Sequence, residues 1–231
     1  MFVFEERPSD ARLVETVWRT RSGNDLPGHF TSVAASQWEL TLTRQQGRTR
    51  LHLRGPETHA SRAAIPPDAE FLGLRFRLGS FMPHLPTPER VDGGLELPAA
   101  SARAFWLQGS AWPHPDFDDA DVFVARLVRA GLLTREPIVE QLLRGEAPEL
   151  SPRTLQRRFV QATGVSASVV RRIEQANRAR ALLEAGHSIP DTVFLAGYAD
   201  QPHLTRALKQ LTGQTPGQLR ASGGTEQTPP A

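Results

Sequence analysis

Two groups of polar side chains in the last third of the sequence have the types and spacing needed to read DNA bases. On a helix in the major groove, arginine donates two hydrogen bonds to guanine, and glutamine forms two with adenine. The first group is Arg153, Gln156 and Arg157, and the second is Gln201, His203 and Arg206. Thr205 and Lys209 are placed instead for phosphates, which add affinity without sequence information.

Each group is expected on a short helix with clear start and stop signals. The first helix should begin at Ser151, a good N-cap residue, and end at Gly164. The second should begin at Asp200 and end at Gly213. Each has an apolar row on its other side: Leu155, Phe159 and Ala162 on the first helix, and Leu204, Leu208 and Leu211 on the second.

Further helices should hold these two in place. A helix of about 19 residues is expected over 166–186, with a length of about 28 Å. That length would bring the separation of the two short helices close to one turn of DNA, about 34 Å. A scaffold helix capped by Thr134 should precede the first short helix, and one opened by Pro190 should precede the second. One chain would then read two successive major grooves.

Residues 1–117 have the pattern of an antiparallel β structure. Apolar and polar residues alternate in 38–44 and 50–54, which predicts a hairpin, and again in 70–78. Residues 105–117 are expected to add a strand, and Ala11–Trp18 a short helix. The fold class expected is α+β, with an N-terminal antiparallel, barrel-like (cupin-like) domain followed by an all-α domain.

The amino-acid composition excludes several classes of protein. The 231-residue chain has no cysteine, which excludes disulfides, thiolate zinc sites and cysteine nucleophiles. No stretch approaches the roughly 18 apolar residues of a membrane span, and no signal peptide is visible at the start, so a cytoplasmic protein is expected. Residues 151–220 hold ten Lys or Arg against four Asp or Glu, whereas residues 1–150 hold seventeen against twenty. The basic charge therefore lies with the paired helices.

Alternatives to DNA binding stay open on composition alone. An enzyme with a metal-binding N-terminal barrel would need clustered ligands, but His29, His52, His59, His84 and His114 are scattered. We therefore expect no catalytic residue, no metal and no cofactor. A small apolar ligand is more plausible, in a cavity lined by aromatic residues such as Trp38, Phe71, Phe81, Phe105 or Trp106. A third class is an interaction module whose paired helices bind protein.

The C-terminal pattern resembles the DNA-binding domain of the AraC family of bacterial transcription regulators. The family's Ser-x-Arg-x-Leu-x-Arg-x-Phe run matches Ser151, Arg153, Leu155, Arg157 and Phe159. Its closing pattern matches Gly197-Tyr198, Asp200-Gln201, His203-Leu204, Arg206, Gly213, Thr215-Pro216 and Leu219-Arg220. Thr192 stands where the family usually has an apolar residue.

The resemblance implies two helix-turn-helix motifs joined by a linker helix and bound to promoter DNA. The implied base-contacting residues are the two groups named above, on the first and second recognition helices. The domains expected are a β-rich sensing or dimerisation domain at 1–117, a double helix-turn-helix domain at 118–220 and a flexible tail at 221–231. Double-stranded DNA is the expected partner. RNA polymerase, a small-molecule effector and a second copy of the chain are further candidates, and no membrane is expected.

Overall fold

The computed structural model describes residues 3–23, 28–85, 88–146 and 148–222, and these are divided between two compact units. The first unit consists of Met1–Gly28, Gln37–Pro56 and Ile65–Ala167, and the second of His29–Ser36, Glu57–Ala64 and Ser168–Ala231. The expected boundary at residue 117, between a sensing or dimerisation domain and a DNA-binding domain, stays a prediction. Residues 223–231, most of the expected tail, lie outside the described residues.

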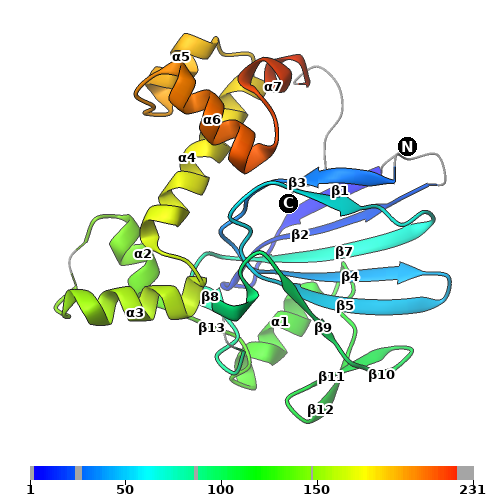
Figure 1. The fold of residues 1–231 in the computed structure, drawn as a ribbon. Helices are drawn as coiled ribbons and strands as arrows, with labels where there is room; N and C mark the ends of the chain where they lie inside the picture. Colours follow the sequence, from blue (N-terminus) through cyan, green and yellow to red (C-terminus); the bar gives the residue numbers. More distant parts are fainter. Residues whose placement is uncertain (1–2, 24–27, 86–87, 147, 223–231) are drawn as a thin grey trace. The chain divides into compact units, whose positions relative to one another are not determined.

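The expected mixture of β and α structure is confirmed, with a six-stranded antiparallel sheet in the first unit (Figure 1). Its strand order is β1-β2-β7-β4-β5-β9. The strands are β1 (Val3–Pro8), β2 (Val14–Arg21), β4 (Glu39–Gln45), β5 (Arg48–Arg54), β7 (Ala69–Phe76) and β9 (Gly94–Leu97). Because β1 and β9 are edge strands that do not pair with each other, no closed barrel is seen among the described residues.

The predicted hairpin and third strand are confirmed as β4, β5 and β7. Leu40 pairs with Leu53 across the hairpin, and Leu42 pairs with Leu51. All four are 1% exposed, and they share one core with helix α1 (Ala120–Arg129), which buries Phe123, Val124 and Leu127. The period-2 alternation therefore marks the buried face of the sheet correctly.

Smaller strands complete the first unit. Residues 99–113, which overlap the region 105–117 expected to add a strand, form a three-stranded sheet of β10 (Ala99–Ser101), β11 (Ala104–Leu107) and β12 (Ser110–Pro113). Strands β8 (Ser80–Phe81) and β13 (Thr134–Arg135) pair with each other, and a short 3-10 helix, η1, spans Pro88–Arg90.

The helix expected over Ala11–Trp18 is wrong, because this segment lies mostly in strand β2. Strand β2 pairs with β1 on one side and with β7 on the other. In the middle of the strand both faces are covered, so the consecutive residues Thr16, Val17 and Trp18 are all buried, whereas Glu15, Arg19 and Arg21 are exposed. The three consecutive buried residues interrupt the alternation by which a strand is recognised.

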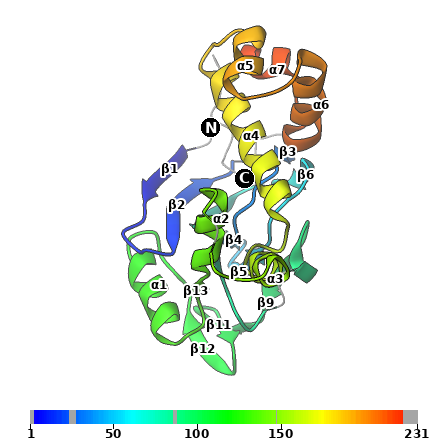
Figure 2. The ribbon, with the colours of Figure 1, turned by 90° about the vertical axis from the view of Figure 1, so that its left-hand side faces the viewer.

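Two further helices of the first unit, α2 (Pro137–Leu143) and α3 (Pro152–Thr163), lie beside each other in Figure 2. The expected cap at Thr134 is wrong, because Thr134 belongs to β13 and pairs with Phe81. Glu136 caps α2 instead, with its carboxylate accepting a hydrogen bond of 3.2 Å from the backbone N–H of Ile138.

Glu136 also fixes α3 against α2. Its two carboxylate oxygens accept hydrogen bonds from the Nε and Nη2 atoms of Arg158, at 2.9 and 2.8 Å. The Glu136 side chain is only 12% exposed. A paired, two-point contact of this kind holds direction as well as distance. One carboxylate therefore sets both the start of α2 and the position of α3.

The second unit packs its helices around α4, as Figure 2 shows. Its elements are α4 (Ala167–Glu184), α5 (Ile189–Leu195), α6 (Gln201–Thr212), α7 (Pro216–Ser222), and the paired strands β3 (His29–Ser32) and β6 (Ser61–Ala64). Ile173, Ala176 and Leu183 of α4 are buried together with Leu204 and Leu208 of α6.

No helix among the described residues is long and apolar enough to cross a membrane.

A close approach between β2 and β7 constrains the sheet. The Trp18 indole lies on Gly73, where an added Cβ would fall 2.0 Å from the ring. The indole Nε1 donates a hydrogen bond of 3.0 Å to Glu39 Oε2, which also lies 3.4 Å from Arg75 Nη2. A side chain at position 73 would therefore displace Trp18 and break its bond to a buried carboxylate.

We expect Gly73→Ala to lower the free energy of unfolding by about 1–3 kcal/mol, the usual cost of overpacking a core. Chemical denaturation followed by tryptophan fluorescence would measure it. Gly93→Ala is the matched control, because its added Cβ would lie 3.8 Å from the nearest atom. Equal stability of the two variants would contradict the packing described for Trp18.

Candidate nucleic-acid interface

Helix α3 has the predicted caps at both ends. The Ser151 hydroxyl accepts a hydrogen bond of 3.3 Å from the backbone N–H of Thr154. Gly164 ends the helix in the left-handed conformation, at φ 79°, which favours glycine. Phe159 and Ala162 are buried as expected, and Leu155 is half-buried. The local sequence signals therefore place this helix correctly.

The predicted base-contacting residues of α3 share its outer face. Arg153, Gln156 and Arg157 are all exposed. Within the part of the chain that the structure describes, neither arginine of this group forms an ion pair. Arg158, the next residue along, is instead held by Glu136. This face presents two guanidinium groups and one amide that are free to bind a ligand.

Helix α6 repeats the design. The Asp200 carboxylate accepts a hydrogen bond of 2.7 Å from the backbone N–H of His203, and Gly213 ends the helix at φ 74°. The predicted row is buried: Leu204 and Leu208 are fully covered, and Leu211 is 3% exposed. Of the predicted DNA-contacting residues, Gln201, His203, Arg206 and Lys209 are exposed and Thr205 is half-buried.

A tyrosine that the sequence analysis did not assign to the site supports His203. The rings of Tyr198 and His203 meet edge to face, with centroids 5.1 Å apart. Tyr198 is 7% exposed, and its burial raises the pKa of its hydroxyl, against the opposing effect of Arg178 and Arg172. The tyrosine is a neutral support that limits the orientations of the imidazole.

Helix α5, which precedes α6, accommodates Thr192 at a position where an apolar residue was expected. Thr192 is completely buried, and its hydroxyl donates a hydrogen bond of 2.9 Å to the carbonyl of Ser188. Ser188 also caps α5 through the N–H of Asp191, at 3.1 Å. The polar side chain is thus satisfied within its own helix, which allows its methyl group to pack.

Gln175 of α4 holds the turn between α5 and α6. Its Nε2 donates hydrogen bonds to the carbonyls of Ala196 and Gly197, at 3.1 and 2.9 Å. No local pattern pointed to this residue, because the contact joins segments that lie far apart in the sequence. The two groups of residues predicted to read DNA belong to different compact units, and the distance between the groups stays a prediction.

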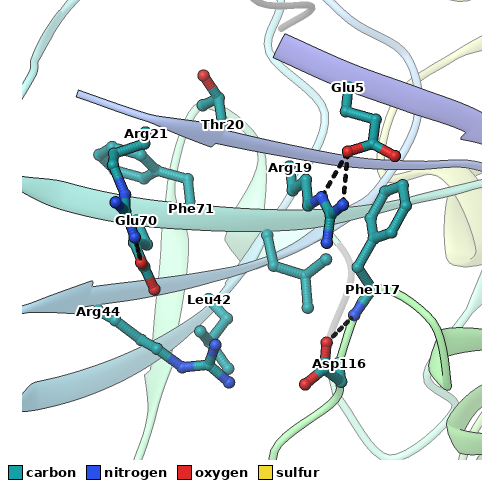
Figure 3. Close-up of a pocket in the computed structure, with 11 residues that line it drawn as sticks. Glu5, Arg19, Thr20, Arg21, Leu42, Arg44, Glu70, Phe71, Asp116 and Phe117 are labelled. Atoms are coloured by element: carbon teal, nitrogen blue, oxygen red, sulfur yellow. Dashed lines mark hydrogen bonds and ion pairs between the residues drawn. The ribbon is translucent and has the colours of Figure 1, made fainter. Parts of the chain in front are cut away.

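The first unit also contains a pocket of about 420 Å³, shown in Figure 3. Arg19 lies 2.6 Å from Glu5 and 4.3 Å above the ring of Phe117. Figure 3 shows no interaction between Arg44 and the other residues drawn. The pocket is lined by Glu5, Arg19, Thr20, Arg21, Leu42, Arg44, Glu70, Phe71, Leu72, Asp116 and Phe117.

Of the aromatic residues expected around a cavity, only Phe71 lines this pocket. Trp38 and Phe105 are buried in the core of the first unit, and Phe81 is 9% exposed. Trp106 is 47% exposed. Trp38 and Phe105 do not line the pocket because they pack in the same core as the buried residues of α1, and Trp106 faces solvent.

A metal-binding enzyme gains no support from the described residues. They contain no group of three or more His, Asp or Glu side chains that could hold a metal ion. His52 has one acidic neighbour, with its Nε2 atom 3.5 Å from Glu96 Oε2. The expectation that the chain is not an enzyme stays a prediction.

Comparisons with known proteins agree with the helices described here. A family profile described as a helix-turn-helix domain matches residues 146–222. HTH-type transcriptional regulator VirS of Mycobacterium tuberculosis is 36% identical over 100 residues, which cover 43% of this chain and 27% of VirS. HTH-type transcriptional regulator RipA of Corynebacterium glutamicum is 41% identical over 71 residues, covering 31% of this chain and 22% of RipA.

The matched segment spans about a quarter of the length of these curated relatives. No solved structure matches the chain significantly. The profile covers α3 to α7, the helices that carry the two capped, basic faces. Residues 146–222 therefore form a helix-turn-helix domain that is similar to parts of HTH-type transcriptional regulators.

Proposed function

We propose that the chain is a sequence-specific transcription regulator that binds double-stranded promoter DNA through α3 and α6. The observation that carries the proposal is the outer face of α3, where Arg153, Gln156 and Arg157 are exposed on a helix capped at both ends. Side chains without internal partners can give all their hydrogen bonds to base edges, where arginine and glutamine distinguish guanine and adenine.

The second helix takes the same role in the proposal. Gln201, His203 and Arg206 would read bases in a second major groove, and Thr205 and Lys209 would bind phosphates. Helix α4 has 18 residues, so its length is about 27 Å. A spacing close to one DNA turn would let one chain occupy two successive grooves. RNA polymerase and a second copy of the chain are further candidate partners.

The pocket of the first unit supports control by a small ligand. We propose that it binds a carboxylate with an apolar body. Arg44 would bind the carboxylate, and Leu42, Phe71 and Phe117 would cover the apolar part. Residues 1–117 would then have the expected sensing role. The alternative, a metal-dependent enzyme joined to the DNA-binding helices, would be supported by stoichiometric metal in the purified protein.

We expect Arg157→Ala to cost about 1–3 kcal/mol on the cognate site and little on random DNA, because it removes a base contact. Arg158→Ala is the matched control on the same helix. It should lower the stability of the fold by about 2 kcal/mol, because it leaves Glu136 without its partner. Titrations of cognate and random duplexes, together with thermal unfolding, separate the two. Equal losses on both duplexes for Arg157→Ala would refute base reading.

Lys209→Ala should weaken binding to every sequence to the same extent, because a phosphate contact carries no base information. Its salt dependence should flatten by about one unit of slope in log affinity against log salt concentration. Binding titrations at several salt concentrations measure this slope. A change of base preference at unchanged slope would mean that Lys209 contacts a base.

Aromatic carboxylates, beginning with benzoate, should stabilise the first unit. At a hundredfold excess over the dissociation constant the gain is about 2–3 kcal/mol. Arg44→Ala should abolish this gain, whereas Arg48→Ala, on an exposed arginine that does not line the pocket, should keep it. Thermal unfolding with and without ligand is the measurement. The proposed pocket chemistry fails if no aromatic carboxylate stabilises the wild-type chain.

A further inference from the structure

A two-stranded ribbon from the N-terminal half of the chain is part of the second helix-turn-helix unit. Strand β3 pairs with β6 from His29↔Ala64 to Ser32↔Ser61, and a further bridge joins Ala35 to Glu57. We call residues 29–36 and 57–64 the ribbon. They belong to the same compact unit as α4 to α7, although more than a hundred residues separate them from α4 in the sequence.

The ribbon supplies hydrogen bonds that α6 lacks at its C-terminal end. The last four carbonyls of a helix have no partner within it. The Lys209 carbonyl accepts a bond of 3.2 Å from the N–H of Gly213. The next two are satisfied by the ribbon: Ala34 N–H donates to Leu211 at 2.7 Å, and Ala60 N–H donates to Gln210 at 2.9 Å. Both strands of the ribbon therefore cap the same helix end.

Side-chain packing joins the ribbon to the same helices. Ala34 is 1% exposed and lies in one apolar cluster with Leu208 and Leu211 of α6. A Cβ added at Gly213 would fall 2.9 Å from Thr31 Cγ2 and 3.5 Å from Ala60 Cβ. Ser36 is also buried, and its hydroxyl donates a hydrogen bond of 2.7 Å to Glu174 of α4.

We propose that the ribbon positions the second recognition helix: it closes the C-terminal end of α6 and holds that end against α4. The residues expected to read DNA lie toward the other end, and Gln201, His203 and Arg206 stay exposed with the ribbon in place. The ribbon thus supports the reading face without covering it. Binding by α6 requires residues that precede the helical region by a long stretch of sequence.

The proposal has a part that rests on the proposed function and a part that does not. The ribbon's effect on the rigidity of α6 can be tested without DNA. The need for a rigid α6 to read the second half of a site rests on the proposed function. Hydrogen exchange tests the first part, and footprinting on a duplex selected from random DNA by the full wild-type chain tests the second.

The first experiment compares Ala34→Asp with Ala64→Asp in the full chain. Ala34 is buried against α6, whereas Ala64 is exposed at the other end of the same ribbon. Ala34→Asp should make the backbone amides of residues 205–213 exchange at least tenfold faster and leave those of α3 unchanged. It should also remove protection of one half of the selected site. Ala64→Asp should do neither.

Equal exchange rates of α6 in the two aspartate variants would overturn the proposal. Faster exchange with an unchanged footprint would overturn the positioning role alone. If the wild-type chain selects no DNA, the proposed function fails, and the exchange rates still decide whether the ribbon holds α6.

A second experiment does not depend on a disruptive substitution. The chain has no cysteine, so Ala60→Cys with Gly213→Cys introduces a unique pair. The Cβ separation of 3.5 Å lies within the range of a disulfide. The oxidised chain should keep both halves of the footprint and bind within threefold of its reduced form. Gly213→Cys alone is the control for the left-handed position.

Two results of the crosslinking experiment would overturn the proposal. One is that the disulfide does not form in the folded chain under oxidising conditions, because the ribbon would then not lie against α6. The other is a tenfold or greater loss of DNA affinity on oxidation that is reversed by reduction. That loss would mean that α6 must leave the ribbon in order to bind.

Discussion

Short helices with unpaired ends are the constraint on which both candidate reading faces depend. Helices α3 and α6 have 12 residues each, a length at which an isolated helix is marginal in water. Caps at both ends satisfy some of the orphan backbone groups. Contacts from outside each helix add to these caps: Glu136 holds α3 through the side chain of Arg158, and the ribbon donates hydrogen bonds to two carbonyls at the end of α6.

This constraint also separates the polar residues that hold the structure from those free to bind. Arg157 and Arg158 are neighbours in sequence, yet Arg157 is exposed and forms no ion pair with any residue that the structure describes, whereas Arg158 is fixed by a carboxylate that is 12% exposed. Arg158 is held in the structure because the carboxylate of Glu136 faces it. On α6, Arg206 faces solvent, whereas the row of leucines on the opposite side of the helix is buried.

Sequence signals were reliable where their physical cause is local. The caps at Ser151 and Asp200 and the glycine ends at Gly164 and Gly213 act within one helical turn, and all four are confirmed. The hairpin was also visible, because one of its faces is buried and the other polar. The strand over Val14–Arg21 was missed because three consecutive residues at its centre are buried, which interrupts the alternation. Thr134 cannot cap α2 because it is paired in a strand with Phe81, a contact between distant segments.

Contacts between distant segments left no signal to read. Arg158 is one arginine among many, and its partner is fixed only when α2 and α3 pack together. The ribbon is harder still, since it acts through the backbone N–H groups of Ala34 and Ala60, and every residue except proline has such a group. A small side chain at position 34 permits the close approach. In the sequence it is only one more alanine.

The ribbon also changes how the two parts of the chain are connected. A helical domain joined at Ala167 alone could turn freely about one linker. Here the chain passes between the two compact units five times, at the ends of both ribbon segments and at the start of α4. Because the ribbon is hydrogen-bonded to α6, bending at residue 167 cannot by itself move α6 away from the segments that flank the ribbon. Either the ribbon must detach from α6, or its flanking segments must move with the helix.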